Sequence, residues 1–531
     1  MLRRGTTIGL AALCLIGPLA ASSTEPSASR LAAELRRLYR EPGGPGERWG
    51  HRPYEVTLAD GTRAPRDAAY RDRPEFVAAA EALLASTSGD DASLGAWLLS
   101  TLPEPRAAAA EGVLIEALRH PDKRAAFEAA RALGRRGSSG CLPALERAAQ
   151  REDSAEVRAA AAWARAAVAG RHREPVSAAP RPGPLPASFL RGVSWWVSEG
   201  RRDAGAGSFQ ELAALGVRWV SIHTWEPRQR SLDAPDFLPG NGRFGIRDLP
   251  ALVRNAHKAG LKVLYKPHLE MRGFDASPEE EAVFRRGDAA TRRILFERVR
   301  KEGRLLGGRH NEIEMRTEAD WRAWFANYAD YILAHARLAQ EAGADMLSVG
   351  RELDRTVARR EADWRVLIGR IRALYSGRLT YAANFDSYRD LGFWDALDAI
   401  GISAYFALCD TPDPTPEDLS RGWDRALRPL EELSRRYGKP VLMAEVGYPA
   451  VPGAAAAPWR ETRGEADVWL QARLYEAAFA AMAKRPWIQG AFPWLWEGTA
   501  QPPFRDPSYS IQGKPAAFVL ARWYGGGGGG S

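Results

Sequence analysis

From residue 189 to the end of the chain, apolar runs of strand length alternate with amphipathic runs of helix length. The eight strand-like runs span residues 192–197, 217–223, 261–268, 345–350, 379–384, 399–405, 441–445 and 488–494. Helix-like runs lie between them, for example at residues 321–342, 361–375 and 465–483. Eight strand–helix units in succession predict an α/β fold, a closed (β/α)8 TIM barrel over residues 189–524, in preference to an open doubly wound sheet.

Two of these runs lead directly to a glutamate. Residues 441–444 are apolar and are followed by Glu445, and the run at residues 345–350 is followed, after one arginine, by Glu352. Because the C-terminal ends of parallel strands meet at one face of a barrel, we expect the two carboxylates to face one pocket. A carboxylic acid and a carboxylate are the pair that glycoside hydrolysis needs. Either glutamate alone could be a surface cap or an ion-pair partner, and it is their shared position that favours catalysis.

Polar and aromatic side chains stand at the ends of the other strand-like runs. They are Trp195, Trp196, His223, Trp225, Lys266, His268, Asn384, Tyr405, Trp494 and Trp496. Aromatic faces stack on sugar rings while amides and imidazoles bond to hydroxyl groups, so this set is typical of a carbohydrate site. A single tryptophan here is more often a core or rim residue, and the grouping at one face carries the prediction.

The N-terminal part of the chain has a different composition. Residues 74–170 are rich in Ala, Leu, Arg and Glu in segments of helix length, and an Arg-Ala-Ala segment at residue 124 recurs at residue 158. A spacing of this length between similar helices predicts HEAT-like α-helical repeats. We interpret them as a module that braces the barrel, with a docking surface for a protein or for cell wall as the alternative.

Three further segments complete the expected organisation. Residues 23–73 are rich in Pro, Gly and charge and are expected to form an irregular lead-in with one short helix. Residues 171–188 contain five prolines and predict a semi-rigid linker between two separate cores. Residues 525–531 form a Gly-rich tail.

The first 22 residues have the pattern of a secretory signal peptide. Two arginines precede an apolar run that is too short to span a bilayer, and small residues follow it. We therefore expect a secreted or periplasmic protein without a transmembrane segment. Cys14 lies in this leader, but Leu13 precedes it where a lipoprotein cleavage site has a small residue, so we do not expect lipid anchoring.

Charge and cysteine content argue against several classes of protein. The formal net charge is +8, but Lys and Arg alternate with Asp and Glu without a basic block, which argues against a nucleic-acid partner. Only Cys141 and Cys409 lie outside the leader, so no disulfide framework is expected. The eight histidines form no metal-binding motif, and we expect neither a metal nor a cofactor.

Residues 190–523 resemble the glycoside hydrolase family 113 β-mannanases, which are retaining enzymes with (β/α)8 barrels. The most specific pieces are Lys266-Pro267-His268, Glu318-Ala319-Asp320-Trp321, Val349-Gly350-Arg351-Glu352-Leu353, Tyr381-Ala382-Ala383-Asn384, Phe393-Trp394-Asp395, Gly401-Ile402-Ser403-Ala404-Tyr405, Glu445-Val446-Gly447-Tyr448 and Tyr509-Ser510-Ile511-Gln512-Gly513.

The resemblance implies a role for four residues. Glu352 is the implied acid/base, Glu445 the nucleophile, Tyr405 the residue that orients the nucleophile, and Trp494 the floor of the subsite for the reacting sugar. Two features depart from the family pattern. Arg351 stands where the family has a small polar residue, and the segment at residues 272–311 is longer and more charged.

We therefore expect a secreted retaining glycoside hydrolase that cleaves a β-linked polysaccharide or oligosaccharide, with β-1,4-mannan as the leading substrate. The alternative is a catalytically silent carbohydrate-binding barrel whose repeats bind a protein, and Arg351 beside the acid is its main support. A third hypothesis places the function in the repeats alone.

Overall fold

The computed structural model describes residues 27–40, 55–57, 63–65, 70, 73–102, 106–151, 153–172, 185–196, 205–229, 232–235, 237–238, 248–271, 294–295, 298, 310–460, 465–497 and 503–525. The expected signal peptide lies outside them, as do most of the proline-rich linker, the Gly-rich tail beyond residue 525 and most of the segment at residues 272–311.

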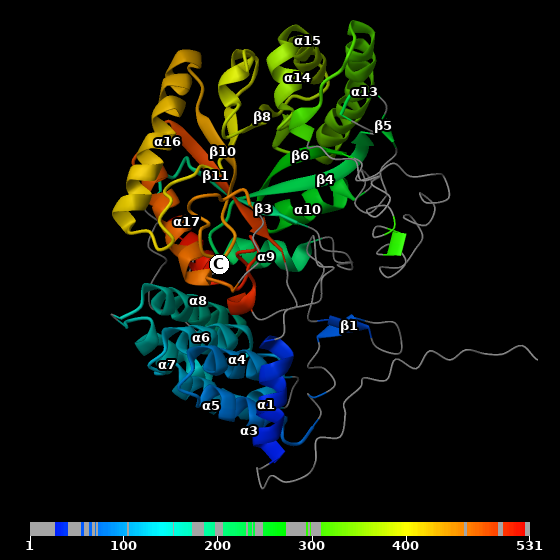
Figure 1. Cartoon of the computed structure of the whole chain (residues 1–531). Helices are drawn as coiled ribbons and strands as arrows, with labels where there is room; N and C mark the ends of the chain where they lie inside the picture. Colours follow the sequence, from blue (N-terminus) through cyan, green and yellow to red (C-terminus); the bar gives the residue numbers. More distant parts are fainter. Residues whose placement is uncertain are drawn as a thin grey trace, which may run out of the picture.

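Eight parallel strands close into a barrel (Figure 1). They are β3 (Leu190–Trp195), β4 (Trp219–Gln229), β6 (Lys262–Met271), β7 (Met346–Arg351), β8 (Arg378–Asn384), β9 (Ile400–Ser403), β10 (Val441–Gly447) and β11 (Ile488–Trp496). These strands follow one another round the ring in chain order, and β3 pairs with both β4 and β11, which closes it. A short strand, β5 (Phe237–Leu238), pairs antiparallel with the end of β4. The predicted (β/α)8 barrel is confirmed, and each predicted strand overlaps an observed one.

Helices cover the outside of the barrel. They are α9 (Ala206–Ala214), α10 (Leu249–Lys258), α13 (Glu318–Ala342), α14 (Asp354–Arg359), α15 (Glu361–Arg372), α16 (Pro416–Tyr437), α17 (Val468–Ala483) and α18 (Pro515–Tyr524). Local sequence sets their ends, as in α13, which begins at a capping box of Thr317 and Asp320 and ends at the left-handed Gly343.

The expectation of a helix after every strand is wrong at one place. Between β8 and β9 the chain forms only the short 3-10 turns Tyr388–Asp390 and Trp394–Ala396. The connection is short and begins with turn-forming Asp386 and Ser387, which favour local hydrogen bonding over a helix.

The N-terminal helices stack as the repeat pattern predicts. They are α1 (Ser27–Arg40), α3 (Phe76–Leu84), α4 (Gly89–Ser100), α5 (Arg106–Ala117), α6 (Lys123–Arg136), α7 (Leu142–Ala148) and α8 (Ala155–His172). Helix α4 packs on α6 and α6 packs on α8, so successive hairpins bury each other's apolar faces.

The lead-in is more ordered than its composition suggests. Helix α1 packs against α3, and Tyr70 donates a hydrogen bond to Glu34 at 2.8 Å. A hairpin of β1 (Glu55–Thr57) and β2 (Arg63–Pro65) follows α1. The one short helix expected in the lead-in is therefore present as α1, and the β1–β2 pair is an element that the sequence did not predict.

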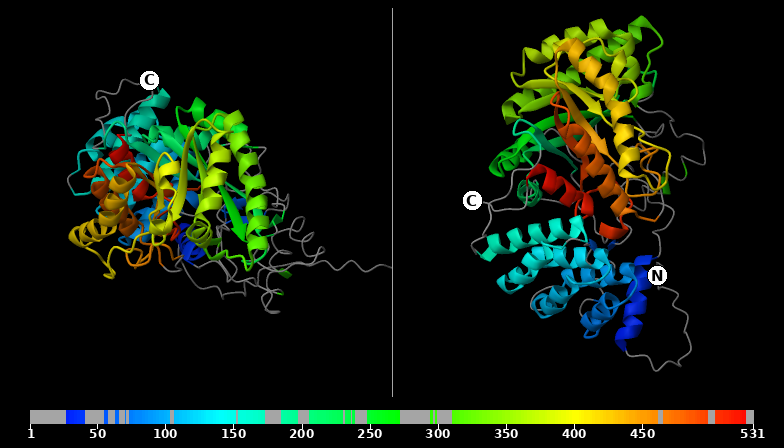
Figure 2. Two further views of the ribbon diagram at one scale, coloured as in Figure 1. Left: turned by 90° about the horizontal axis from the view of Figure 1, so that it is seen from above. Right: turned by 90° about the vertical axis from the view of Figure 1, so that its left-hand side faces the viewer.

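The helical stack packs directly on the barrel (Figure 2). Phe518 of α18 lies edge-on to Phe127 of α6, with ring centroids 5.0 Å apart, and edge-on to Trp163 of α8 at 5.6 Å. Phe127 also meets Trp469 of α17 at 5.9 Å, and the Lys123 ammonium lies 4.4 Å from the centre of the same indole. One continuous apolar cluster contains most of the buried apolar residues of both the repeats and the barrel, so the expectation of two separate cores is wrong. The bracing interpretation of the repeats fits these contacts.

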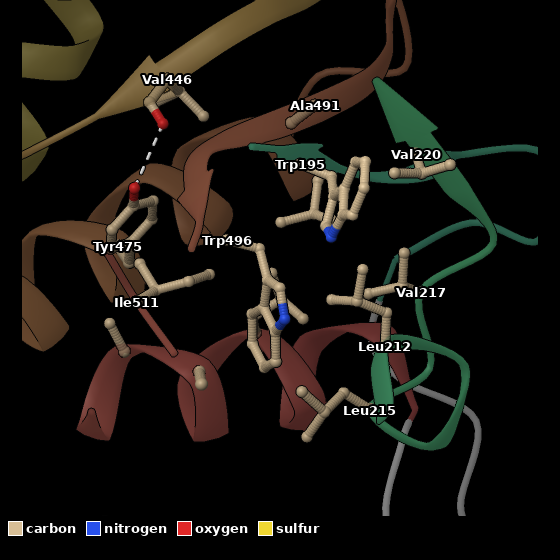
Figure 3. Close-up of a cluster of buried hydrophobic side chains, with 14 of the residues drawn as sticks. Trp195, Leu212, Leu215, Val217, Val220, Val446, Tyr475, Ala491, Trp496 and Ile511 are labelled. Atoms are coloured by element: carbon tan, nitrogen blue, oxygen red, sulfur yellow. Dashed lines mark hydrogen bonds between the residues drawn. The ribbon is translucent and has the colours of Figure 1, made fainter. Parts of the chain in front are cut away.

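An apolar layer lies between the barrel strands and the outer helices (Figure 3). Trp195 is 2% exposed and Trp496 is 1% exposed, and both pack here near Leu212 and Ile511. The Trp195 ring also lies 4.9 Å from that of Phe209 on α9. The prediction that these two tryptophans bind substrate is wrong, because their rings point into the packed layer outside the barrel.

None of the helices in the described part of the chain is both long and apolar enough to cross a membrane.

Candidate active site

Glu445 lies buried near the C-terminal end of β10, where the pairing of β10 with β9 shifts register just before it. Such irregularities turn a side chain away from the regular sheet alternation. Its carboxylate accepts a hydrogen bond from Tyr405 at 2.8 Å through one oxygen and from Lys266 at 2.5 Å through the other. Lys266 also donates to the Ala444 carbonyl at 3.3 Å. The predicted contact of Tyr405 with Glu445 is present, and the lysine fixes the second oxygen.

Glu352 follows β7 directly and has a left-handed backbone, with φ of 50°. This conformation is strained for a residue other than glycine and persists only where the surroundings hold it. Two contacts do so here. The Glu352 N–H donates to the Ala382 carbonyl at 2.8 Å, and the next N–H, of Leu353, donates to the Tyr381 hydroxyl at 2.7 Å. The regular strand β7 ends just before this left-handed residue.

Two basic side chains hold the Glu352 carboxylate. Arg351 donates to its Oε2 at 2.9 Å, and the Nε2 atom of His310 lies 3.0 Å from the same oxygen. Burial opposes ionisation of Glu352, but Arg351 and His310 outweigh it and hold the pKa of this carboxyl below its ordinary value. Burial, together with the charge of Arg351, lowers the pKa of His310, so this ring is neutral at pH 7.

The two glutamates lie close enough for both charges to act on the same two buried side chains. Burial raises the pKa of Tyr405 well above its ordinary value, and the charges of Glu445 and Glu352 both raise it further. Lys266 is affected in the same way: burial lowers its pKa, while both carboxylates oppose that change. Tyr405 and Lys266 therefore sense both carboxylates, as expected for side chains that share a small buried space.

His223 and His268 form a buried pair beside this pocket, with Nδ1 of the first 3.0 Å from Nε2 of the second. Burial, with the charges of Lys266 and Arg351, lowers the pKa of both rings well below the ordinary value, so both are neutral at pH 7. Neutral imidazoles can donate to or accept from sugar hydroxyls.

One group of donors could reach a single metal ion. The ligand atoms of His223, His268 and Glu445 all lie within 4.8 Å of one another. Lys266 already binds the Glu445 carboxylate from inside the pocket, so a metal ion there would meet an ammonium group at close range. The pair of imidazoles fits hydroxyl recognition better.

The aromatic residues divide into two sets. Trp494 is partly exposed and lies edge-on to His223, with ring centroids 5.1 Å apart, and to Trp196 at 6.2 Å. The Lys266 ammonium is 5.7 Å from the centre of the Trp494 ring. These contacts bring Trp494 and Trp196 into the site, whereas Trp195 and Trp496 belong to the core. Of Trp225 the structure describes only the backbone.

Two residues near the site were not singled out in the sequence. Asp354 accepts a hydrogen bond from Asn384 at 3.2 Å, and burial raises its pKa to about 6. His310, the partner of Glu352, lies alone in a charged segment where no periodicity marks it. Asp354 follows Glu352 by two positions, and that spacing could have suggested a second carboxyl in the site.

The comparisons with known proteins agree with this geometry. Residues 309–514 match the family model described as Glycoside Hydrolase Family 113, and residues 78–166 match the model of HEAT repeats. Among solved structures, the chain is similar to the GH113 β-mannanase AaManA from Alicyclobacillus acidocaldarius in complex with ManMIm, at 28% identity and a TM-score of 0.51, over 63% of this chain and 97% of that chain.

A GH113 β-1,4-mannanase is similar at 25% identity and a TM-score of 0.51, over 63% of this chain and 98% of that chain. No curated protein sequence matches the chain significantly. Fold, paired glutamates and family match together establish a glycoside hydrolase. More narrowly, the stretch that matches the glycoside hydrolase family 113 model follows the stretch that matches the HEAT repeats model.

Proposed function

We propose that the protein is a retaining β-glycosidase that acts by double displacement, with β-1,4-mannan or a related β-linked glycan as substrate. The observation that carries the proposal is the pair of buried glutamates held in different ways in one pocket, Glu445 by Tyr405 and Lys266 and Glu352 by Arg351 and His310. The two similar β-mannanases support the choice of glycan.

In the first step, Glu445 attacks the anomeric carbon while Glu352 gives its proton to the leaving oxygen, which forms a glycosyl ester on Glu445. In the second step, Glu352 takes a proton from the water that attacks the same carbon, and the sugar leaves with its original configuration. Tyr405 and Lys266 each bond to one oxygen of Glu445, so they orient the nucleophile before attack.

Trp494 is the proposed floor for the reacting sugar, with Trp196 beside it. His223, His268 and Asn384 are proposed to bond to sugar hydroxyls, since their side chains stand at the strand ends around the two glutamates.

Location and partners complete the proposal. The leader pattern at residues 1–22 supports export to the cell exterior or the periplasm, which suits an enzyme for polymeric glycans. One side of the HEAT repeats packs on the barrel, so a protein or cell-wall partner would bind to the opposite side. Detection of the full-length protein in the cytoplasmic fraction of its host cells would contradict export.

The test is product analysis with the full-length protein on mannan, glucomannan, xylan and β-glucan. We expect new reducing ends from mannan or glucomannan, and their loss in Glu445→Ala and Glu352→Ala. Asp424→Asn is the control, because this carboxylate pairs with Arg485 on the surface of α16, 58% exposed, and should leave activity unchanged. Equal activity in Glu445→Ala and the control would refute the proposed site.

A further inference from the structure

Three polar atoms near Glu352 are buried without a hydrogen bond among the residues that the structure describes. They are Oδ1 of Asp354, Oγ of Ser387 and Oδ1 of Asn311, and we call these three residues the polar cluster. Burial raises the pKa of Asp354, the nearby Ser387 and Asn311 lower it, and the charge of Glu352 raises it, so the cluster lies beside the acid. Buried polar atoms of this kind are costly, and a group of them is typical of a place that ligand hydroxyls fill.

An exposed tryptophan packs on the segment that carries Ser387. Trp459 is 38% exposed, and its ring stacks on that of Phe385, with centroids 5.0 Å and planes 20° apart. Phe385 directly follows Asn384 and lies edge-on to the buried Phe406 at 6.2 Å. Phe385 therefore covers one face of the indole, and the exposed part of Trp459 lies on the other face and the edges. We call Trp459 and Phe385 the aromatic platform.

The segment that carries Trp459 is tied to the catalytic residues. The Tyr509 hydroxyl donates to the carbonyl of Pro458. The Tyr509 ring lies edge-on to that of Tyr405, with centroids 6.2 Å apart, and Tyr405 donates to Glu445. The indole is thus held in place before a ligand arrives, and a preorganised surface loses little entropy on binding.

The order of the strands places the platform and the cluster on one side of the pocket. Asn384 ends β8, which pairs with β7, the strand that leads to Glu352. Strand β8 is the fifth of the eight in the ring, so it lies opposite the first, β3, which leads to Trp196. Trp196 lies beside Trp494, the proposed floor for the reacting sugar. Because Glu352 gives its proton to the leaving oxygen, the sugar on the side of β7 and β8 is the one that leaves.

We propose that the aromatic platform and the polar cluster form a subsite for the first sugar of the leaving group. The inference rests on the proposed function and names the residues that select its leaving group, a sugar ring with free hydroxyls in place of a small aglycone. The indole takes a C–H face of the ring. Oδ2 of Asp354 accepts from Asn384 at 3.2 Å, which leaves Oδ1 to accept from a sugar hydroxyl.

The experiment compares two substrates that form the same glycosyl-enzyme on the full-length protein. Mannotetraose cleaved at its middle bond releases mannobiose, whereas β-mannobiosyl fluoride releases fluoride, which leaves the subsite empty. The readout is the kcat/KM of mannotetraose divided by that of the fluoride. In Trp459→Ala this ratio should fall about 10-fold to 100-fold, the range of an aromatic anchor in an interface.

Further variants separate binding from stability. In Asp354→Asn the ratio should fall about 10-fold, the effect of a lost hydrogen bond to a charged group. Trp459→Phe should restore most of the ratio, because it keeps an aromatic face. The controls are Val366→Ala, 66% exposed on α15, and Asp424→Asn, 58% exposed on α16, and both should keep the wild-type ratio.

The outcomes distinguish the inference from the proposed function. An unchanged ratio in Trp459→Ala or in Asp354→Asn, or a wild type that cleaves only the fluoride, would overturn the inference and leave the glycosidase standing. If the wild type cleaves neither substrate, the proposed function fails, and titration calorimetry with mannotetraose still decides the inference. Binding that is lost in Trp459→Ala and kept in Val366→Ala supports the subsite, whereas equal binding by both variants, or none by the wild type, refutes it.

Discussion

Replacing Phe518 by alanine tests whether the repeats and the barrel form one structural unit. The Phe518 ring is 3% exposed and lies edge-on between Phe127 and Trp163 of the repeats, at 5.0 and 5.6 Å. Truncation of a buried phenylalanine to alanine costs about 3–5 kcal/mol. Of this, each edge-on ring pair accounts for about 0.5–1.5 kcal/mol.

Urea unfolding of the full-length protein, followed by far-UV circular dichroism, measures the effect. We expect one main transition in the wild type, and a lower midpoint or two separate transitions in Phe518→Ala, because the shared apolar cluster is interrupted at its junction. The double variant with Phe127→Ala should lose less than the sum of the single losses, by about 0.5–1.5 kcal/mol. Val366→Ala is the control, since that side chain is 66% exposed on α15.

A loss in Phe518→Ala no larger than that in Val366→Ala would refute the reasoning. Strict additivity of the two phenylalanine substitutions would show that their contact does not couple repeats to barrel.

Three further predictions concern the site. Tyr405→Phe removes the hydroxyl that donates to Glu445 at 2.8 Å, and kcat should fall about 10-fold to 100-fold with an unchanged circular dichroism spectrum; unchanged kcat would argue against an orienting role. Trp496→Ala should lower the free energy of unfolding by about 3–5 kcal/mol, whereas Trp494→Ala should mainly raise KM. Thermal melts and kinetics on the same preparations compare the two variants. The reverse pattern would contradict the assignment of Trp496 to the core and Trp494 to the site. Basic neighbours hold the pKa of Glu352 below its ordinary value, so its ionised form stabilises the fold above the ordinary carboxyl pKa and this stabilisation disappears as the pH falls below it. As the pH is lowered from about 6 to 3, the melting temperature should therefore fall more steeply in the wild type than in Glu352→Gln. Parallel curves of melting temperature against pH would contradict this.

The positions of the strands and of both glutamates could be predicted from the sequence, because each is marked by a short pattern of neighbouring residues. Apolar runs of strand length end at Glu445 and just before Glu352, and the fold places strand ends together. The helix expected between β8 and β9 could not be excluded in this way, since a closed barrel tolerates a short connection at one position.

The sequence alone could not predict which tryptophans face the site and which lie in the core. Trp195 and Trp196 are adjacent, and adjacent side chains on a strand point to opposite faces, whereas Trp494 and Trp496 are two positions apart and would share one face of a regular strand. Which face is the pocket depends on the register of β11 against β3, which shifts between Trp494 and Trp496. That shift comes from long-range packing and leaves no local pattern.

The partners of the glutamates were also beyond the local sequence. His310 reaches Glu352 from 42 positions away, and Lys266 reaches Glu445 across 179 positions. The resemblance to the family suggested the Tyr405 contact with Glu445, whereas the contact of His310 with Glu352 follows only from side chains that the fold brings together.

The anomeric configuration of the first-formed product, followed by proton NMR, tests the double displacement most directly. The account predicts a β-configured product from the wild type, an α-configured azide adduct from azide-rescued Glu445→Ala, and a β-configured azide adduct from azide-rescued Glu352→Ala with an activated aryl glycoside. An α-configured first product from the wild type, or the same configuration from both rescued variants, would contradict the roles assigned to Glu445 and Glu352.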